Sequence, residues 1–237
     1  MFPHIEYYLT QKRKNEEHMR NKLFFKVYKN TIKRLFDLMI AVLSVMILSP
    51  LFILVGILVR IKIGSPVLFK QKRPGLHGKP FTIYKFRTMT DERDGNGALL
   101  PDGERLTRIG RFLRKTSMDE LPELFNVLKG DMSIVGPRPL LMRYYPYFTD
   151  EEKIRFSVLP GITGLSQVSG RNDLPWDKRI ATDLQYVYNY SFNLDIWILL
   201  MTVRRVITRH GLRVDPGKTM IDFDEERRQR LKNTQFK

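Results

Sequence analysis

Residues 35–59 read LFDLMIAVLSVMILSPLFILVGILV, and this run of 25 residues is the strongest local signal in the sequence. Its only polar members are Asp37, Ser44 and Ser49, and Pro50 follows Ser49 in its middle. As one straight helix the run would extend roughly 37 Å, which is enough to cross the ~30 Å hydrocarbon core of a bilayer. The run therefore predicts a helix that enters a membrane.

A serine–proline pair in the middle of this run argues against a straight crossing. Proline removes an amide donor from a helix, and its ring clashes with the carbonyl group four residues earlier. Pro50 therefore predicts a kink or a full break. The hydroxyl of Ser49 is expected to satisfy a carbonyl group that the proline leaves free.

Basic residues flank the run equally on both sides, so the positive-inside rule gives it no direction. We therefore expect residues 33–62 to form a re-entrant helix, with both ends on the cytoplasmic side and the turn at Ser49-Pro50. An ordinary kinked single pass and a buried core helix of a soluble protein are the alternatives. The basic residues are Lys22, Lys26, Lys29, Lys33 and Arg34 before the run, and Arg60, Lys62, Lys70, Lys72 and Arg73 after it.

Composition narrows the chemistry that the chain can perform. The 237 residues carry a formal net charge of +16 and include no cysteine, which excludes disulfides, thiolate nucleophiles and Cys-ligated metal centres. The four histidines lie far apart in the sequence, so a His-rich metal site is poorly supported. A strongly basic chain indicates an anionic partner: nucleic acid, a lipid headgroup or a phosphorylated small molecule.

The rest of the chain divides into three parts. Residues 1–32 form a basic N-terminal extension without the pattern of a cleaved signal peptide. Residues 63–212 are expected to form one mainly helical α/β domain with a small β-hairpin and interfacial amphipathic helices. Residues 213–237 are charged and are expected to be a solvated tail.

Within the central part, short strands give way to helices. Val67–Gln71 and Phe81–Met89 are rich in β-branched and aromatic residues and flank a Gly/Pro-rich tip, which predicts a hairpin. A polar loop is expected over Asp91–Gly103 and a short strand over Met132–Val135. Helices are expected over Arg105–Lys115, Asp119–Lys129, Asp177–Tyr190 and Leu194–Arg209.

Two features connect these elements to a membrane. The helix over Leu194–Arg209 has an apolar face, a tryptophan and a basic end, which fits a helix in the membrane interface or, equally, a core helix with a basic last turn. Asp37 lies near the start of the apolar run. Because ionisable groups at membrane depth find partners, we expect Asp37 to pair with Lys33 or Arg34.

Residues 117–122, SMDELP, offer two interpretations. Ser117 and Glu120 have the spacing of a capping box, so the motif fits the start of a helix, with Asp119 as an alternative N-cap ahead of Pro122. The functional interpretation uses the same carboxylates. Two adjacent acidic groups can hold Mg²⁺ together with substrate phosphates, and an ionised aspartate is a competent nucleophile toward phosphorus.

Cationic residues accompany this acidic pair along the sequence. Lys85 and Arg87 lie on one face of a predicted strand, Arg114 lies on a predicted helix, and Arg138 is held between two prolines. Arginine suits the two-pronged binding of phosphate. Each cation alone fits an ordinary surface charge, but together they predict a phosphate-binding site around Asp119.

At this point the motifs resemble the bacterial sugar transferase family, the monotopic polyprenyl-phosphate phosphoglycosyl transferases. The resemblance extends from about residue 33 to about residue 205 and is closest to small single-domain members such as the diacetylbacillosamine-phosphate transferase. The motifs occur in the order KRLFD (33–37), SP (49–50), KFRTM (85–89), SMDELP (117–122), NVLKGDMS (126–133), GPRP (136–139) and PGITG (160–164).

The resemblance implies a transferase that moves a sugar-1-phosphate from a UDP-sugar to undecaprenyl phosphate on the cytoplasmic face of the bacterial inner membrane. It assigns Asp119 as the nucleophile that forms a covalent phosphosugar intermediate and releases UMP. Glu120 would help to hold Mg²⁺ or orient the lipid phosphate. Arg138, Arg87, Lys85 and Arg114 are the candidate phosphate-binding residues.

Sugar recognition is not readable from the sequence. We expect contributions from residues 167–173, which include Gln167 and Arg171, and from Asp183. The alternative function is a non-catalytic basic protein that binds a membrane surface. Nucleic acid is not an expected partner, because no nucleic-acid fold signature occurs in the sequence.

Overall fold

A computed structural model describes residues 31–170, 174–208 and 221–235. The predicted N-terminal extension therefore lies almost entirely outside the described residues, and Arg171 lies outside them as well. The helices are α2 (Lys33–Lys62), α3 (Asp102–Arg105), α4 (Arg108–Thr116), α5 (Glu123–Lys129), α6 (Leu165–Ser169), α7 (Trp176–Tyr188), α8 (Phe192–Thr208) and α9 (Phe223–Gln235). The strands are β1 (Leu68–Pro74), β2 (Pro80–Phe86), β3 (Ser133–Val135) and β4 (Gly161–Thr163).

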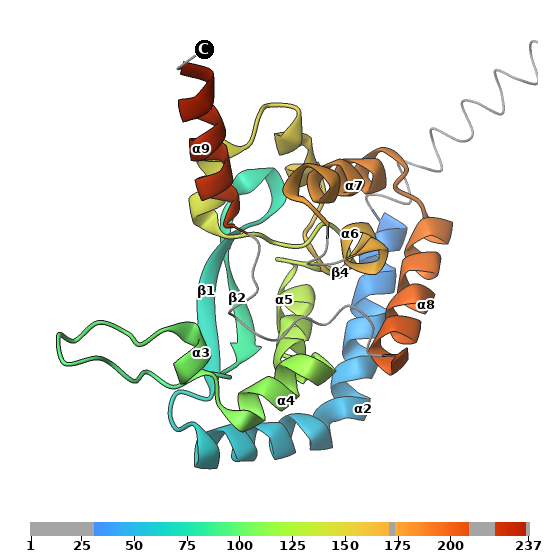
Figure 1. The fold of residues 1–237 in the computed structure, drawn as a ribbon. Coiled ribbons are helices and arrows are strands. Elements are labelled where there is room, and N and C mark those ends of the chain that lie inside the picture. Colours follow the sequence, from blue (N-terminus) through green and yellow to red (C-terminus); the bar gives the residue numbers. More distant parts are fainter. Residues whose placement is uncertain (1–30, 171–173, 209–220, 236–237) are drawn as a thin grey trace, which may run out of the picture.

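Helix α2 bends part-way along its length, as Figure 1 shows. It is assigned as one continuous helix with Pro50 inside it. The Ser49 hydroxyl donates a hydrogen bond to the carbonyl oxygen of Met46 at 2.9 Å. That carbonyl is four residues before Pro50 and would accept from the amide that proline lacks. The predicted kink and the predicted role of Ser49 are both confirmed.

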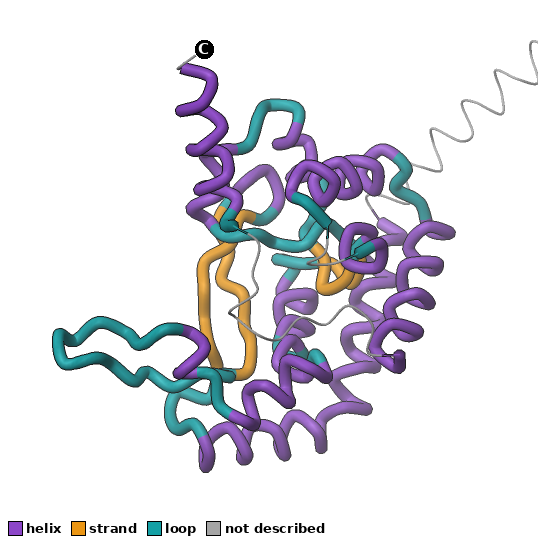
Figure 2. The backbone as a smooth tube through the Cα atoms, in the orientation of Figure 1, coloured by secondary structure: helices purple, strands orange, loops and turns teal. Residues whose placement is uncertain are grey.

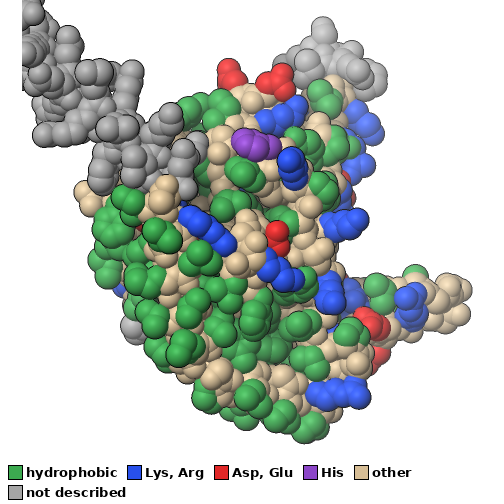
Figure 3. All heavy atoms as spheres, turned by 180° about the vertical axis from the view of Figure 1, so that it is seen from behind, with side chains coloured by type: hydrophobic (Ala, Val, Ile, Leu, Met, Phe, Trp, Pro, Cys, Tyr) green, Lys and Arg blue, Asp and Glu red, His purple; other side chains and the backbone are tan. Residues whose placement is uncertain are grey.

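Helix α2 and helix α8 share a broad apolar surface. Among the described residues, α2 is the one helix long and apolar enough to cross a membrane. Most of its large apolar side chains are exposed, and α8 exposes Trp197 to 46% although Ile198 beside it is fully buried. Figure 3 shows hydrophobic side chains covering one side of the molecule. Helix α8 thus packs one face on the core and exposes a second apolar face. It therefore has features of both the core helix and the interfacial helix that the sequence allows.

A buried ion-pair cluster fixes the start of α2 to the rest of the fold. Lys33 Nζ lies 2.9 Å from Asp37 Oδ1 and 2.8 Å from Asp195 Oδ2 at the start of α8. Asp37 Oδ1 also accepts a hydrogen bond from the Ile134 amide at 3.1 Å. The predicted pairing of Asp37 is confirmed with Lys33, whereas Arg34 donates to backbone carbonyls at the end of α5.

Two small sheets support the domain. Strands β1 and β2 form the predicted antiparallel hairpin, which extends to Pro74 and Pro80 and so has a shorter tip than expected. The predicted strand near residue 133 is confirmed as β3, which pairs in parallel with β4. Figure 2 shows the polar loop after β2 projecting away from the body before the chain returns through α3.

The expectation of a solvated C-terminal tail is wrong where α9 begins, whereas residues 228–233 are exposed as expected. Phe223 is 0% exposed and packs among aromatic residues that include Tyr144, Phe148 and Trp176. Arg227 of α9 lies 2.6 Å from Glu152 Oε1. One buried aromatic side chain, Phe223, therefore anchors an otherwise charged helix. The composition of the C-terminal segment as a whole does not indicate that contact.

Candidate active site

The acidic pair lies in a short turn rather than in a helix. Residues 118–120 form a single 3₁₀ turn between α4 and α5, and α5 begins at Glu123. The predicted helix start at Asp119 is therefore wrong, because the missing amide of Pro122 places the helix after it. The capping-box interpretation is also wrong: Ser117 has φ = 56° and ends α4, and its side chain makes no capping hydrogen bond.

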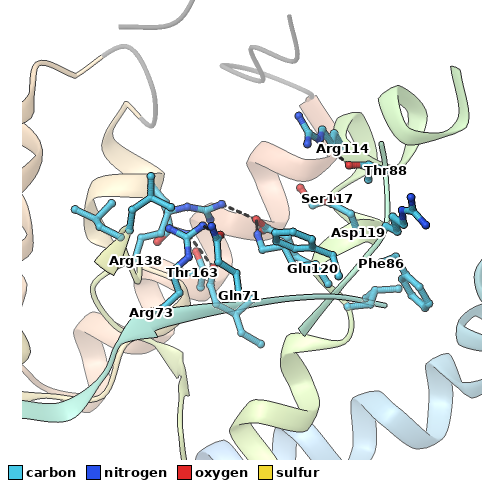
Figure 4. Close-up of a pocket in the computed structure, with 18 of the residues that line it drawn as sticks. Gln71, Arg73, Phe86, Thr88, Arg114, Ser117, Asp119, Glu120, Arg138 and Thr163 are labelled. Atoms are coloured by element: carbon cyan, nitrogen blue, oxygen red, sulfur yellow. Dashed lines mark hydrogen bonds and ion pairs between the residues drawn. The ribbon is translucent and has the colours of Figure 1, made fainter. Parts of the chain in front are cut away.

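This turn forms part of the wall of a cavity of about 1100 Å³. The cavity lies among the β1–β2 hairpin, the turn, α4, α7 and the segment around Arg138, and it reaches side chains of α2 and α8. Figure 4 shows Asp119, Ser117 and Arg114 on one side of Glu120, and Arg138 and Arg73 on the other. Residues from distant parts of the sequence thus meet around one acidic pair.

Asp119 lines the cavity and is 9% exposed. Its carboxylate makes no hydrogen bond or ion pair with any residue within the described ranges. Burial and then the neighbouring Glu120 raise the pKa of Asp119, and Lys85, Arg114 and Arg138 oppose that rise. A carboxylate with no protein partner at a cavity wall is available to a substrate or a metal ion.

Glu120 is held in the opposite way. Its Oε1 accepts hydrogen bonds from Lys85 Nζ and Arg138 Nη2, both at 2.6 Å. Burial alone would raise the pKa of Glu120, but Arg138 and Lys85 outweigh burial and hold it well below its usual value. Glu120 is therefore ionised and fixed, and its Oε2 accepts no hydrogen bond from the part of the chain that is described.

Arg138 is positioned from its backbone as well as from its side chain. Arg155 Nη2 donates to the Arg138 carbonyl oxygen at 2.9 Å and to Asp183 Oδ2 at 2.6 Å. Arg155 and Asp183 are both buried. The pair of Arg138 with Glu120 raises the pKa of the Arg138 guanidinium above its ordinary value. A buried ion pair behind the GPRP segment thus fixes the predicted phosphate-binding arginine.

Lys85 joins the acidic pair to a further carboxylate that the sequence analysis did not single out. Its Nζ lies 3.0 Å from Glu123 Oε1, in addition to its contact with Glu120. Glu123 is 2% exposed, and burial raises its pKa to about 7 against the opposing charge of Lys85. Lys85 is thus shared between two carboxylates.

The remaining predicted cations differ in how free they are. Arg114 lines the cavity and donates from Nε to Thr88 Oγ1 at 3.1 Å. Arg87 also lines the cavity, but it donates to the Met89 and Ser65 carbonyl oxygens and pairs with Asp91 at 2.5 Å. Most of the donors of Arg87 are therefore committed to the protein, whereas Arg114 has one neutral partner.

Helix α4 packs closely on the segment around Thr88, which follows β2, and this packing places Arg114 at the cavity wall. A Cβ atom on Gly110 would lie 1.9 Å from the Thr88 carbonyl oxygen, so only glycine allows this approach. The Thr107 hydroxyl caps the same helix by accepting from the Gly110 amide at 2.9 Å.

The predicted sugar-binding residues are partly placed by the structure. Gln167 lines the cavity, where its Nε2 donates to the Ile162 carbonyl oxygen at 2.8 Å. Asp183 borders the cavity too, but its Oδ2 is engaged by Arg155. Arg171 falls outside the described residues, so its contribution to sugar binding stays a prediction.

Sequence reasoning missed several cavity residues. Gln71 and Arg73 line the wall from β1, and Arg179 lines it from α7. The sequence pattern places Arg73 among the charges that flank the apolar run. Alternation along the hairpin was the available signal, because Phe69, Gln71 and Arg73 share the face that carries Lys85 on the partner strand.

The acidic groups fit Mg²⁺ only as a metal shared with substrate. Among the described residues, no group of three or more His, Cys, Asp or Glu side chains is arranged to hold a metal ion. The free carboxylate of Asp119 and the second oxygen of Glu120 are the available ligands. Mg²⁺ is commonly bound by one or two carboxylates together with substrate phosphates, so these residues fit that mode.

Comparison with known proteins gives a consistent set of relatives. A profile of the bacterial sugar transferase family matches residues 28–209. The chain is 58% identical over 181 residues to the uncharacterized sugar transferase EpsL of Bacillus subtilis, covering 76% of this chain and 90% of that protein. It is 41% identical over 197 residues to the undecaprenyl-phosphate galactose phosphotransferase of Salmonella typhimurium, covering 76% of this chain and 41% of that longer protein.

A third relative is the UDP-glucose:undecaprenyl-phosphate glucose-1-phosphate transferase of Caulobacter vibrioides. The identity is 39% over 186 residues, which cover 74% of this chain and 70% of that protein. The profile match extends from the start of α2 to the end of α8 and includes every cavity residue discussed above. The chain belongs to the bacterial sugar transferase family.

Proposed function

We propose that this chain transfers a sugar-1-phosphate from a UDP-sugar to undecaprenyl phosphate, through a covalent intermediate on Asp119. The observation that carries the proposal is the contrast within the acidic pair. Glu120 is held by two cations, while Asp119 faces a basic cavity and has no hydrogen-bond or ion-pair partner among the described residues. The names of two relatives, an undecaprenyl-phosphate galactose phosphotransferase and a UDP-glucose:undecaprenyl-phosphate glucose-1-phosphate transferase, support the substrate classes.

In the first step an Asp119 carboxylate oxygen attacks the phosphorus that bears the sugar. The bond from that phosphorus to the bridging oxygen breaks, its electron pair stays on that oxygen, and UMP departs. In the second step a phosphate oxygen of undecaprenyl phosphate attacks the same phosphorus. The bond between phosphorus and the Asp119 oxygen breaks, which restores the carboxylate and yields a lipid diphosphate sugar.

The cations of the cavity stabilise charge during both steps. Arg138 and Lys85 lie against Glu120 and face the cavity, and Arg114 lies on the Asp119 side. Fixed positive groups beside a phosphoryl centre are the main requirement of phosphoryl transfer. Asp119 and Glu120 would hold Mg²⁺ with the substrate phosphates, and the ion would offset charge on the phosphoryl oxygens.

We also propose that α2 is re-entrant, so that the cavity lies at the cytoplasmic face of the inner membrane. The bend at Ser49-Pro50 and the exposed apolar sides of α2 and α8 support this arrangement. Ser44 and Leu48 of α2 border the cavity, which would bring the lipid phosphate to the acidic pair. Because the chain contains no cysteine, single cysteines before residue 33 and after residue 62 can be labelled in intact cells. Labelling from the same side is expected, and labelling from opposite sides would overturn the re-entrant topology.

The catalytic proposal is tested by incubating purified enzyme with UDP-sugars and Mg²⁺ in the absence of lipid. A covalent route predicts release of about one UMP per enzyme molecule, and no release from Asp119→Asn. Steady UMP production by Asp119→Asn after lipid is added would refute the assignment of the nucleophile.

A further inference from the structure

One arginine of the cavity wall has no carboxylate partner in the described parts of the chain. Arg73 Nη2 donates to the amide oxygen of Gln71 at 2.6 Å, and Arg73 Nε is buried without any partner there. Arg87 is matched with Asp91 and Arg138 with Glu120, whereas Arg114 on the Asp119 side has, like Arg73, a neutral partner. A guanidinium with only an amide beside it has unused donors and uncompensated charge.

The surroundings of Arg73 add to this excess of positive charge. Burial, and then the nearby Arg138 guanidinium, lower the pKa of Arg73 to about 10, against the opposing charges of the neighbours Glu123 and Glu120. Arg73 is therefore still protonated at neutral pH, and its charge is poorly matched by the protein. An anionic ligand would supply the missing partner, and a phosphate group fits the planar donor geometry of arginine.

The position of Arg73 along the hairpin indicates which phosphate it meets. Phe69 lies opposite Lys85 near the start of β1, and Arg73 follows four residues later on the same face. That spacing is roughly 13 Å along the strand. Strand β1 begins close to the end of α2 and runs towards α9, as Figure 1 shows. Arg73 therefore lies at the end of the cavity wall that is farther from the apolar helix.

This end of the cavity suits a soluble ligand better than a lipid phosphate. Figure 4 places Arg73 and Arg138 on the side of Glu120 opposite Asp119. An in-line attack by Asp119 needs its leaving group on the far side of the phosphorus. Resting on the proposed function, we propose that Arg73, oriented by Gln71, binds the phosphate of the nucleotide that departs as UMP.

The test compares the binding of UMP and uridine to the detergent-solubilised full chain with Mg²⁺, by isothermal titration calorimetry. Arg73→Met is expected to weaken UMP binding about tenfold to a hundredfold and to leave uridine binding unchanged. Arg73→Lys keeps the positive charge but lacks the planar guanidinium, so its affinity for UMP should lie between those of wild type and Arg73→Met. Lys70→Met removes one positive charge from the exposed part of the same strand, outside the cavity, and should change neither affinity.

The alternative outcomes separate this inference from the proposed function. If the wild-type enzyme releases UMP but Arg73→Met binds UMP as tightly as wild type, the Arg73 assignment fails and the proposed function stands. An increased KM for undecaprenyl phosphate with unchanged UMP affinity would place the acceptor there and overturn the inference. Equal loss of UMP and uridine binding in both Arg73 variants would also overturn it. Wild-type enzyme that neither binds nor releases UMP would contradict both.

Discussion

Two clusters of charged residues in this molecule differ in how cations and carboxylates are shared and in whether the cluster reaches solvent. At the start of α2, one cation, Lys33, is shared by two buried carboxylates, Asp37 and Asp195. Around the cavity, one carboxylate oxygen of Glu120 is shared by two cations, Lys85 and Arg138. The first cluster is closed from solvent, whereas the second borders a cavity of about 1100 Å³.

The difference separates a cluster that holds the fold from one that receives a ligand. In the closed cluster, the Ile134 amide and the Tyr186 hydroxyl donate further hydrogen bonds, to Asp37 Oδ1 and Asp195 Oδ1. In the open cluster, Arg73 and Arg114 have neutral partners, and the carboxylate of Asp119 has no hydrogen-bond or ion-pair partner in the described part of the chain. Substrate phosphates would complete the second cluster, which is the physical basis of the proposed reaction.

Removing the cation of the closed cluster should have the largest effect on stability. Lys33→Met would leave two buried carboxylates without their shared partner, which costs about 3–5 kcal/mol. Thermal unfolding in detergent measures the loss. Lys62→Met, at the exposed other end of α2, should change stability by less than about 0.5 kcal/mol. Equal stabilities of the two variants would show that the closed cluster does not hold the fold.

Removing a cation of the open cluster should act on turnover instead. Arg138→Met is expected to lower the rate of product formation about 10²- to 10³-fold, because a fixed charge beside the phosphoryl group is lost. Arg93→Met, in the exposed loop where the Arg93 side chain donates to the Gly97 carbonyl oxygen, is the matched control. An Arg138 variant that unfolds as readily as Lys33→Met, but turns over normally when folded, would reverse our assignment of the two clusters.

Much of this architecture was predictable from local sequence. The kink at Pro50 and the role of Ser49 followed from the donor that proline lacks, and the pairing of Asp37 followed from one helical turn of spacing. The hairpin followed from β-branched runs around a Gly/Pro-rich tip. Each of these inferences depends on interactions within a few residues.

The parts that failed depend on contacts between distant segments. The charged sequence of α9 does not predict that Phe223 packs within a buried cluster of aromatic residues. The acidic pair was assigned to a helix start, although Pro122 moves that start to Glu123. The role of Arg73 was obscured by counting it among membrane-flanking charges, since its cavity depends on how the hairpin faces α7 and Arg138.

A smaller effect is expected from the ion pair behind Arg138. Asp183→Asn removes the partner of Arg155, which orients the Arg138 backbone, and should lower kcat about 3- to 30-fold. In an Arg138→Met background the same change should have little further effect, as a double-mutant cycle would reveal. Additive losses would indicate that Asp183 acts independently of Arg138. Asp150→Asn, in an exposed pair with Lys153, is the control.

The smallest effect concerns pH and Glu123. Burial raises its pKa to about 7 in the folded protein from about 4.5 when unfolded, so its ionisation opposes folding. This penalty is absent below about pH 4.5 and grows as pH rises through 7. Glu123→Gln should therefore gain stability relative to wild type, on the order of 1 kcal/mol, between pH 5 and 8. Thermal unfolding across that range measures the difference, and a gap that narrows with rising pH would contradict it.

The most direct test of the central claim is the mass of the enzyme after reaction with donor alone. Intact-protein mass spectrometry of enzyme treated with a UDP-sugar and Mg²⁺, without lipid, should detect the addition of one phosphosugar. Fragmentation should place that group on Asp119, and later addition of undecaprenyl phosphate should remove it. Lipid-dependent turnover without any such adduct, or an adduct on another residue, would contradict the account.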